Sequence, residues 1–175
     1  MDNFVRLLIT EWRRLELPFE DKNIIVAVSG GADSCALIYA LKDLHTRNKL
    51  KNNFIIAHFN HNLRSKESDE DALFVSKLAK EKELESIIYK TKEKPKKKNN
   101  VEQWARTKRY QFLEEVADNY RSTLVLTAHT LNDQAETFLM NLFRGSGLNG
   151  LSAMRPIRKI NTNSDIKLVR PLLTW

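Results

Sequence analysis

The sequence predicts an α/β protein, with a doubly wound parallel sheet flanked by helices in three layers. Three observations predict this class: four short apolar runs occur along the chain, each is followed by a segment of helical periodicity, and the first run ends at a pair of glycines. Repeated strand–helix units favour parallel pairing, because each helix returns the chain to the same edge of the sheet. The 175 residues are enough for one such domain.

Apolar spacing defines the elements of the first unit. Residues 4–17 place apolar side chains at helical spacing and stop before a proline, which predicts an amphipathic opening helix. Residues 24–28 form an apolar run that ends at SGG, as expected for a buried strand that enters a turn. Residues 33–48 carry apolar side chains on one helical face, so the turn leads into a helix.

The same alternation continues through three more units. Strands are expected at 54–57, 86–89 and 124–127, with helices from about 69, from about 101 and up to 143. After residue 150 the pattern weakens, and 166–169 is the remaining candidate strand.

The composition excludes several classes of protein. Hydrophobic residues make up 42% and charged residues 29%, which is typical of globular chains and excludes disorder and fibrous repeats. Cys35 is the single cysteine, so the chain forms no internal disulfide, and a reducing compartment is expected. No apolar run reaches the roughly 18 residues of a membrane span. We therefore expect a cytoplasmic protein with no membrane partner, and the sequence leaves its oligomeric state unknown.

The net charge of +7 is concentrated in two stretches. Residues 91–109 hold eight basic and two acidic residues, and residues 144–170 hold six and one, so the rest of the chain is net negative. Local positive charge favours a polyanionic partner, because neutralised phosphates release counterions. The alternative for the lysine-rich segment 92–100 is a solvated basic loop.

The segment SGGADS at 29–34 is the first candidate site. Ligands of an open parallel sheet bind beyond the carboxyl ends of its strands, where the strand order reverses. Glycines let backbone amides approach an anion, and the start of a helix adds free N–H groups. A phosphate cradle is expected here, although an ordinary turn with Asp33 as helix cap is the alternative. The segment is not a Walker A loop, and GSGLNG at 145–150 is rejected as a dinucleotide motif because it follows a helix.

The segment AHTLNDQAET at 128–137 is the second candidate site. It follows the fourth predicted strand and faces SGGADS if the first and fourth strands are neighbours. Asp133 and Glu136 are three residues apart and share a helical face, so they could hold Mg²⁺ or an ammonium group. The alternative is that these acids only favour the start of a helix.

Six motifs in one order resemble a known family. SGGADS resembles the SGGxDS loop of the PP-loop ATP pyrophosphatases, and the full series resembles the tRNA(Ile)-lysidine synthetases. The motifs are SGGADS (29–34), HFNHNLR (58–64), Glu102 with Arg106, Arg109 and Tyr110, HTLNDQAET (129–137), RGSGL (144–148) and VRPLL (169–173).

The resemblance implies a fold and a reaction. The fold would be a Rossmann-like sheet of the adenine nucleotide alpha hydrolase type. ATP would adenylate the C2 carbonyl oxygen of the wobble cytidine in a tRNA(Ile) with a CAU anticodon, releasing pyrophosphate. Free L-lysine would then displace AMP to form lysidine. ATP and Mg²⁺ are the implied cofactors, and tRNA(Ile) and L-lysine are the implied partners.

The resemblance also implies roles for single residues. One set would hold ATP, with Asp33 also binding Mg²⁺: Ser29, Gly30, Gly31, Asp33, Ser34, His58 and Asn60. A second set would bind lysine: Arg106, Asp133 and Glu136. Asp33, Asp133 and Arg144 would act in catalysis, with Arg144 steadying transition-state charge. The structural alternatives are an Arg106–Glu102 pair and an Arg144 that only caps a helix end. Asn132 departs from the aspartate usual in the family, which puts a metal role for this position in doubt.

Residues 1–175 are expected to be one PP-loop ATP-binding catalytic domain, without the C-terminal tRNA-binding domains of the family. Two other functions stay open. A cytidine thiolase on the same scaffold needs paired cysteines, whereas this chain has only Cys35. A noncatalytic tRNA-binding module is supported by the basic stretches, and lysine-dependent release of AMP would exclude it.

Overall fold

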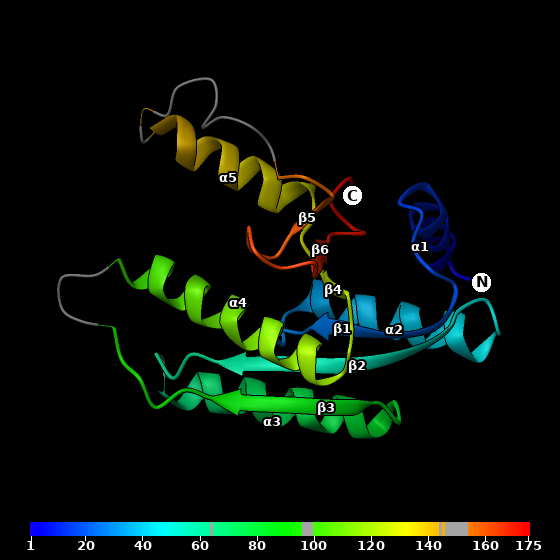
Figure 1. Ribbon diagram of the computed structural model, residues 1–175, viewed down its shortest axis with the longest axis horizontal. Coiled ribbons are helices and arrows are strands. Elements are labelled where there is room, and N and C mark those ends of the chain that lie inside the picture. Colours follow the sequence, from blue (N-terminus) through cyan, green and yellow to red (C-terminus); the bar gives the residue numbers. More distant parts are fainter. Residues whose placement is uncertain (64, 96–99, 144, 146–153) are drawn as a thin grey trace.

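The computed structural model describes residues 1–63, 65–95, 100–143, 145 and 154–175. Figure 1 shows its helices and strands in sequence colours. The helices are α1 (Asn3–Arg14), α2 (Ala32–Thr46), α3 (Ser65–Glu81), α4 (Val101–Asn119) and α5 (Leu131–Phe143). The strands are β1 (Glu20–Ala27), β2 (Lys51–Asn60), β3 (Glu85–Lys90), β4 (Leu124–Thr127), β5 (Ile157–Lys159) and β6 (Lys167–Val169).

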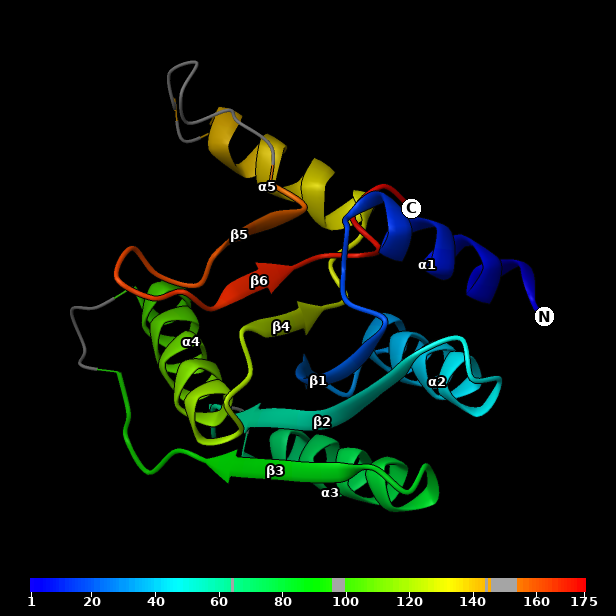
Figure 2. The same ribbon diagram turned by 45° about the vertical axis from the view of Figure 1, so that its right-hand side comes forward.

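Within the described residues the strands form one six-stranded sheet in the order β3-β2-β1-β4-β6-β5. β1 pairs in parallel with β2 on one side and with β4 on the other. The strand order therefore reverses between β1 and β4, and the predicted switch point is confirmed. β6 pairs in parallel with β4, whereas β5 is antiparallel to β6. Figure 2 shows β5 and β6 beyond β4, on the side away from β3.

Helices cover both faces of the sheet, which confirms the three-layer α/β class. On one face, apolar side chains of α1, α2 and α3 pack with Ile24, Val26 and Ile56 of the central strands. On the other face, α4 packs with Ile25 and Ile55, the neighbours that point the opposite way. The central strands β1, β2 and β4 are buried over most of their paired length, as expected for a parallel sheet, whereas β3 is largely exposed.

Several elements differ from the sequence-based expectation: β1 begins at Glu20 instead of residue 24, two more elements begin early, and one strand was not predicted. β2 begins at Lys51 and α3 begins at Ser65, several residues before the predicted starts. β5 was not predicted, because its three residues Ile157–Lys159 are half-buried or exposed and form no apolar run. As an antiparallel strand, β5 also departs from a purely parallel sheet.

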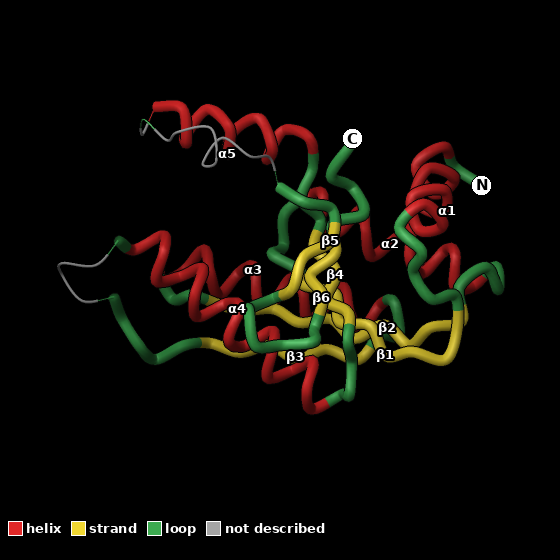
Figure 3. The backbone as a smooth tube through the Cα atoms, turned by 45° about the horizontal axis from the view of Figure 1, so that its top comes forward, coloured by secondary structure: helices red, strands yellow, loops and turns green. Residues whose placement is uncertain are grey.

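The last residues of the chain link α1 with α5. The Trp175 ring packs edge-on against Phe4 of α1, with ring centroids 4.9 Å apart. The Leu131 amide, at the start of α5, donates to the carbonyl of Trp175 at 2.7 Å. α5 has no buried residue among those described, and Figures 1 and 3 show it lying away from the sheet. No helix in the described part of the chain is long and apolar enough to cross a membrane.

Candidate functional site

A cavity of about 390 Å³ lies at the carboxyl ends of β1, β2 and β4. We call it the switch-point cavity, because it opens where the strand order reverses. Five segments contribute to its wall. The polar lining residues are Ser29, Asp33 and Ser34 at the start of α2, His58, Asn60 and His61 at the end of β2, Ser68 and Asp71 of α3, Arg109 and Tyr110 of α4, and Thr127, His129 and Asp133 from the end of β4 to the start of α5.

The glycine loop, residues 29–31 of the SGGADS segment, leads directly into α2. Gly31 is the N-cap residue of α2, and no side chain caps that end of the helix. The N–H groups of the first turn therefore have neither an intrahelical nor a side-chain acceptor. Ser34 Oγ donates to the Gly31 carbonyl at 2.8 Å, and Ser29 Oγ lies 3.3 Å from Ser34 Oγ. The two hydroxyls thus fix the loop and leave the helix end available to an anion.

The two glycines of this loop are needed for different reasons. Gly30 has φ +97°, and a Cβ at this position would lie 3.2 Å from a carboxylate oxygen of Asp71. Gly31 has φ −72°, and a Cβ there would meet only Ser29 Oγ, at 3.5 Å. Gly30 is therefore required by backbone conformation and close packing, whereas Gly31 leaves open space in front of the helix end.

His58 and His61 form a neutral part of the cavity wall. His58 is 4% exposed, and its Nδ1 lies 2.8 Å from the Val28 carbonyl. Because a carbonyl only accepts, Nδ1 carries the proton and Nε2 is left as an acceptor. His58 Nε2 and His61 Nδ1 are buried without a hydrogen-bond partner in the described structure. Burial lowers the pKa of His58, so the ring stays neutral, and its Nε2 can accept a hydrogen bond from a ligand N–H or O–H group.

The opposite part of the wall comes from the segment after β4. Thr127 Oγ1 lies 2.8 Å from His129 Nδ1. Burial, together with the nearby charge of Arg170, lowers the pKa of His129 to about 4. Asp133 accepts from the Thr130 amide at 2.7 Å and from the Thr130 hydroxyl at 3.2 Å. Asp133 thus stabilises the first turn of α5, in the manner of a capping box, and still lines the cavity.

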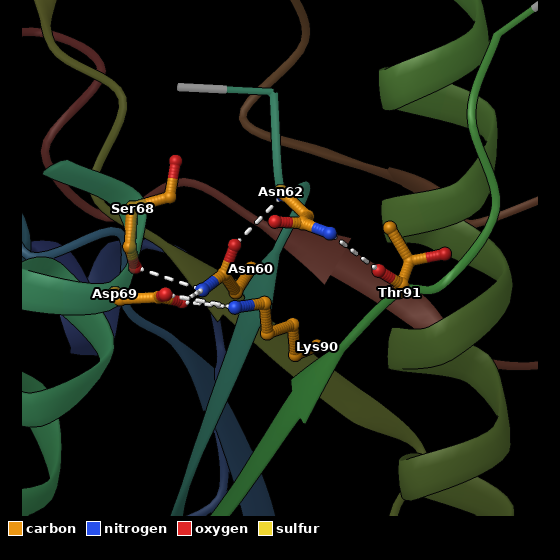
Figure 4. Close-up of polar contacts among 6 residues, drawn as sticks. All are labelled: Asn60, Asn62, Ser68, Asp69, Lys90 and Thr91. Carbon is orange, nitrogen blue, oxygen red and sulfur yellow. Dashed lines mark hydrogen bonds and ion pairs between the residues drawn. The ribbon is translucent and has the colours of Figure 1, made fainter. Parts of the chain in front are cut away.

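Asn60 holds the ends of β2, β3 and α3 together (Figure 4). Its side-chain amide donates to the Ser68 carbonyl and to Asp69 Oδ1, both at 2.9 Å, and its Oδ1 accepts from the Asn62 amide at 2.7 Å. Lys90 Nζ donates to both oxygens of Asp69, at 2.7 and 2.8 Å. This contact with Lys90 lowers the pKa of Asp69. Every donor and acceptor group of the Asn60 side chain therefore has a partner inside the protein.

Four arginines surround Tyr110 on the α4 side of the cavity. The guanidinium carbons of Arg106, Arg109 and Arg158 lie 5.4, 5.5 and 5.0 Å from the ring centroid. Arg170 also interacts with the Tyr110 hydroxyl. Burial raises the pKa of Tyr110, but the arginine charges outweigh it and the net shift is downward. We call these four residues the Tyr110 arginine cluster.

The structure brings most of the predicted site residues to one place. Ser29, Gly31, Asp33, Ser34, His58, Asn60 and Asp133 line the switch-point cavity. Gly30 lies in the loop but is not among the lining residues, and Arg106 and Glu136 are exposed and do not line the cavity. Arg144 and the lysines at 96–98 lie outside the described residues. Arg170, predicted as part of a basic surface stretch, is buried.

Sequence reasoning did not assign a role to several lining residues. His61, Arg109, Tyr110 and His129 stood inside recognised motifs, but helical or strand spacing alone does not say which residue of a motif points inward. Asp71 gave no signal of its own. Asp71 enters the site because α3 begins at Ser65 and runs past the glycine loop.

The carboxylates of the cavity suit one kind of metal site. No group of three or more His, Cys, Asp or Glu side chains among the described residues could hold a metal ion by itself. Mg²⁺ is commonly bound by one or two carboxylates together with substrate phosphates. Asp33 and Asp71 both line the cavity near the glycine loop, so they fit that mode.

Curated relatives named tRNA(Ile)-lysidine synthase are similar to this chain. The one from Enterococcus faecalis is 37% identical over 155 residues, the one from Bacillus subtilis 38% over 161, and the one from Geobacter sulfurreducens 41% over 153. The matches cover 88%, 90% and 86% of this chain, but 32%, 33% and 31% of the relatives. The chain thus spans about a third of the length of these relatives.

A solved structure and a family model agree with the fold. The U34-tRNA thiolase of Methanococcus maripaludis, solved with its 4Fe–4S cluster, has a TM-score of 0.75 at 19% identity, over 98% of this chain and 59% of the thiolase chain. At this identity the likeness shows the fold alone, and it is the adenine nucleotide alpha hydrolase type. A family model described as a PP-loop domain matches residues 6–175. Because that match takes in the glycine loop, the whole sheet and the residues of the cavity, the chain belongs to the PP-loop domain family.

Proposed function

We propose that this chain is the ATP-dependent catalytic domain of a tRNA(Ile)-lysidine synthase. It would ligate L-lysine to C2 of the wobble cytidine in a tRNA(Ile) with a CAU anticodon. The observation that carries the proposal is the placement of SGGADS and the His129–Asp133 segment on facing parts of one cavity. The similarity to curated lysidine synthases over 86–90% of this chain supports the same substrates.

The glycine loop has the features that ATP phosphates require. The uncapped end of α2 offers backbone N–H groups and the positive end of the helix dipole. Ser29 and Ser34 add hydroxyls, and Gly31 leaves room for a phosphate oxygen. Asp33 and Asp71 would hold Mg²⁺, which neutralises phosphate charge when it is bound.

The remaining cavity residues suit the activated base and the amine. Adenylation places the C2 oxygen of cytidine on the α-phosphate and releases pyrophosphate. Attack by the lysine amine at C2 then releases AMP. His129 and His58 are unprotonated, so they can accept hydrogen bonds from amino groups inside the cavity. Asp133 and the exposed Glu136, both on α5, would meet the lysine ammonium, and Arg106 would pair with its carboxylate.

Cysteine chemistry argues against thiolation as the alternative. A cluster-dependent thiolase needs several cysteine ligands, and Cys35 is the single cysteine of this sequence. Burial raises the pKa of the Cys35 thiol, which makes it a weak nucleophile at neutral pH. Its Sγ points to the Gly30 carbonyl, at 3.6 Å. Cys35 therefore packs beneath the glycine loop as a structural residue.

Product analysis tests the proposal directly. With ATP, Mg²⁺, lysine and an unmodified anticodon hairpin, we expect pyrophosphate release that requires the RNA and AMP release that requires lysine. Mass spectrometry of the digested RNA should show lysine added to the cytidine. A hairpin with uridine at that position is the control, and equal turnover of the two hairpins would contradict the proposal.

Two aspartate-to-asparagine variants on α2 test the role of Asp33. Asp33→Asn should abolish pyrophosphate release, because the carboxylate expected at the Mg²⁺-bound phosphates is lost. Asp43→Asn removes the same charge from the far end of α2, where Asp43 pairs with Arg47, and should leave turnover unchanged. Full turnover by Asp33→Asn would remove this residue from the site.

A further inference from the structure

The Tyr110 arginine cluster carries positive charge that the described carboxylates do not neutralise. Arg106, Arg109 and Arg158 lie within 5.5 Å of one ring centroid. None of the four arginines of the cluster forms an ion pair with a carboxylate in the described part of the chain. Grouped guanidiniums repel one another, so such a cluster favours a bound anion.

Arg170 gives a second, independent reason to expect that the cluster binds an anion. It follows β6 at the carboxyl edge of the sheet and is only 2% exposed. One of its Nη atoms donates to the Arg155 carbonyl at 2.7 Å, but its Nε is buried without a hydrogen-bond partner in the described structure. A buried guanidinium is expensive to maintain unless its donors are satisfied. An anion that accepts from the cluster would compensate this charge.

The cluster is separate from the anion site at the glycine loop. Arg109 and Tyr110 enter the switch-point cavity from α4, whereas the end of α2 enters it from the other face of the sheet. Exposure decreases through the cluster, from the exposed Arg106 through the half-buried Arg109 and Arg158 to the buried Arg170. A ligand that reaches in from solvent along this path would place its anionic group against the guanidiniums.

We propose that Arg109, Arg158 and Arg170 of the Tyr110 arginine cluster bind a phosphate group of the RNA substrate, next to the nucleotide whose base enters the cavity. The exposed Arg106 remains the partner proposed for the lysine carboxylate. Planar guanidiniums match the oxygens of a phosphate with paired hydrogen bonds, and no carboxylate in the described part of the chain pairs with these guanidiniums. This inference rests on the proposed function, because it assigns the phosphate to the nucleic acid. The ATP phosphates offer the same chemistry, so the experiment has to separate the two sources.

Binding measurements on three variants test the assignment. Arg109→Gln and Arg158→Gln each remove one guanidinium of the cluster, and Arg121→Gln removes the same charge beyond the far end of α4. Affinity for a fluorescent anticodon hairpin is measured by anisotropy over a range of salt concentrations, and affinity for ATP with Mg²⁺ by calorimetry. Arg109→Lys keeps the charge without the planar donor pair, and thermal melting checks that each variant is folded.

The RNA assignment has a defined result. We expect hairpin affinity to fall about tenfold in Arg109→Gln and in Arg158→Gln. The slope of log affinity against log salt should flatten by about 0.7 for each lost phosphate contact. ATP affinity should stay unchanged, Arg109→Lys should be intermediate, and Arg121→Gln should behave as wild type.

Other results overturn it in distinct ways. Weaker ATP binding with unchanged hairpin binding would assign the cluster to the nucleotide phosphates. Unchanged binding of both ligands in folded variants would make the cluster purely structural. A wild-type chain that releases no pyrophosphate with any hairpin would instead contradict the proposed function, whatever the variants bind.

Discussion

His61 and His129 line the switch-point cavity just beyond the ends of β2 and β4, and both are kept neutral. Burial, and after it the charge of Arg109, lowers the pKa of His61 to about 4. The pKa of His129 is also about 4, for the same main reason. Histidine in an unfolded chain has a pKa of about 6.5. The site therefore offers ring nitrogens as acceptors throughout the neutral range.

These shifts predict how stability depends on pH. Between about pH 6.5 and 4 these histidines bind protons in the unfolded chain but not in the folded one. The free energy of unfolding therefore falls as the pH is lowered. Urea unfolding at pH 7 and pH 5 measures the loss. His129→Gln should show a smaller loss than wild type, whereas the exposed His45→Gln should match wild type. An equal pH dependence in wild type and His129→Gln would contradict the assignment.

Alanine substitutions at the two glycines of the loop should have opposite effects on stability and on ATP binding. Gly31→Ala meets only the Ser29 hydroxyl, so stability should stay within about 0.5 kcal/mol of wild type while ATP binding weakens. Gly30→Ala forces a side chain into φ +97° against Asp71, so we expect a loss of stability of roughly 1–3 kcal/mol. Thermal melting and ATP calorimetry on the same two variants measure both effects. A destabilised Gly31→Ala with normal ATP binding would reverse the assignment.

At the scale of elements, the Asn60 network joins α3 to the ends of β2 and β3. α3 carries Asp71 to the glycine loop, so its attachment to the sheet decides where that carboxylate lies. Asn60 was expected to contact the nucleotide. Its side chain lines the cavity, but its hydrogen bonds are made within the protein, so we assign it a positioning role.

Paired asparagine variants on β2 test that role. Asn60→Ala removes three hydrogen bonds of a buried side chain and should lower the free energy of unfolding by about 1–3 kcal/mol. Asn53 is exposed on the same strand and bonds only Asn23, so Asn53→Ala should change stability by less than about 0.5 kcal/mol. Urea unfolding of both variants provides the comparison. Equal effects would show that the network adds nothing beyond an exposed contact.

Helices and strands with a clear capping residue or apolar run could be predicted from the sequence. A short strand that is defined only by its pairing partner could not. α4 starts at the predicted Val101, because Asn100 caps it by accepting from the Glu102 and Gln103 amides. β4 matches its predicted bounds because all four of its residues are buried and apolar or Thr. β5 is defined by its partner β6 and not by its own sequence, so no local pattern indicated it.

At the scale of the whole molecule, the sequence could predict which segments meet but not which side chains turn inward. The glycine loop and the His129 segment were expected to face each other, and the pairing of β1 with β4 explains why they do. Arg106 and Arg109 lie one helical turn apart on α4. The packing of α4 against the sheet decides that Arg109 lines the cavity and Arg106 stays exposed, and spacing alone carries no information on that.

The charge distribution predicts how the chain binds RNA. Phosphate contacts carry little sequence information, so several tRNAs should bind with similar affinity. That binding should weaken steeply as salt rises, because each contact releases counterions. Competition among purified tRNAs at several salt concentrations measures both properties. Strong preference for one tRNA, unaffected by salt, would place recognition elements within these 175 residues.

The strand order also governs the sequence of events during synthesis. Ile25 of β1 pairs with Ile55 on one side and with Val125 on the other. A growing chain can therefore form the β1–β2–β3 half of the sheet early. The other edge of β1 stays unpaired until the ribosome has added β4. Until then the glycine loop faces solvent on its open side, and a long loop must close before the second half can dock. The nascent domain thus gains its helix-end anion site well before it gains the wall that would select a second substrate.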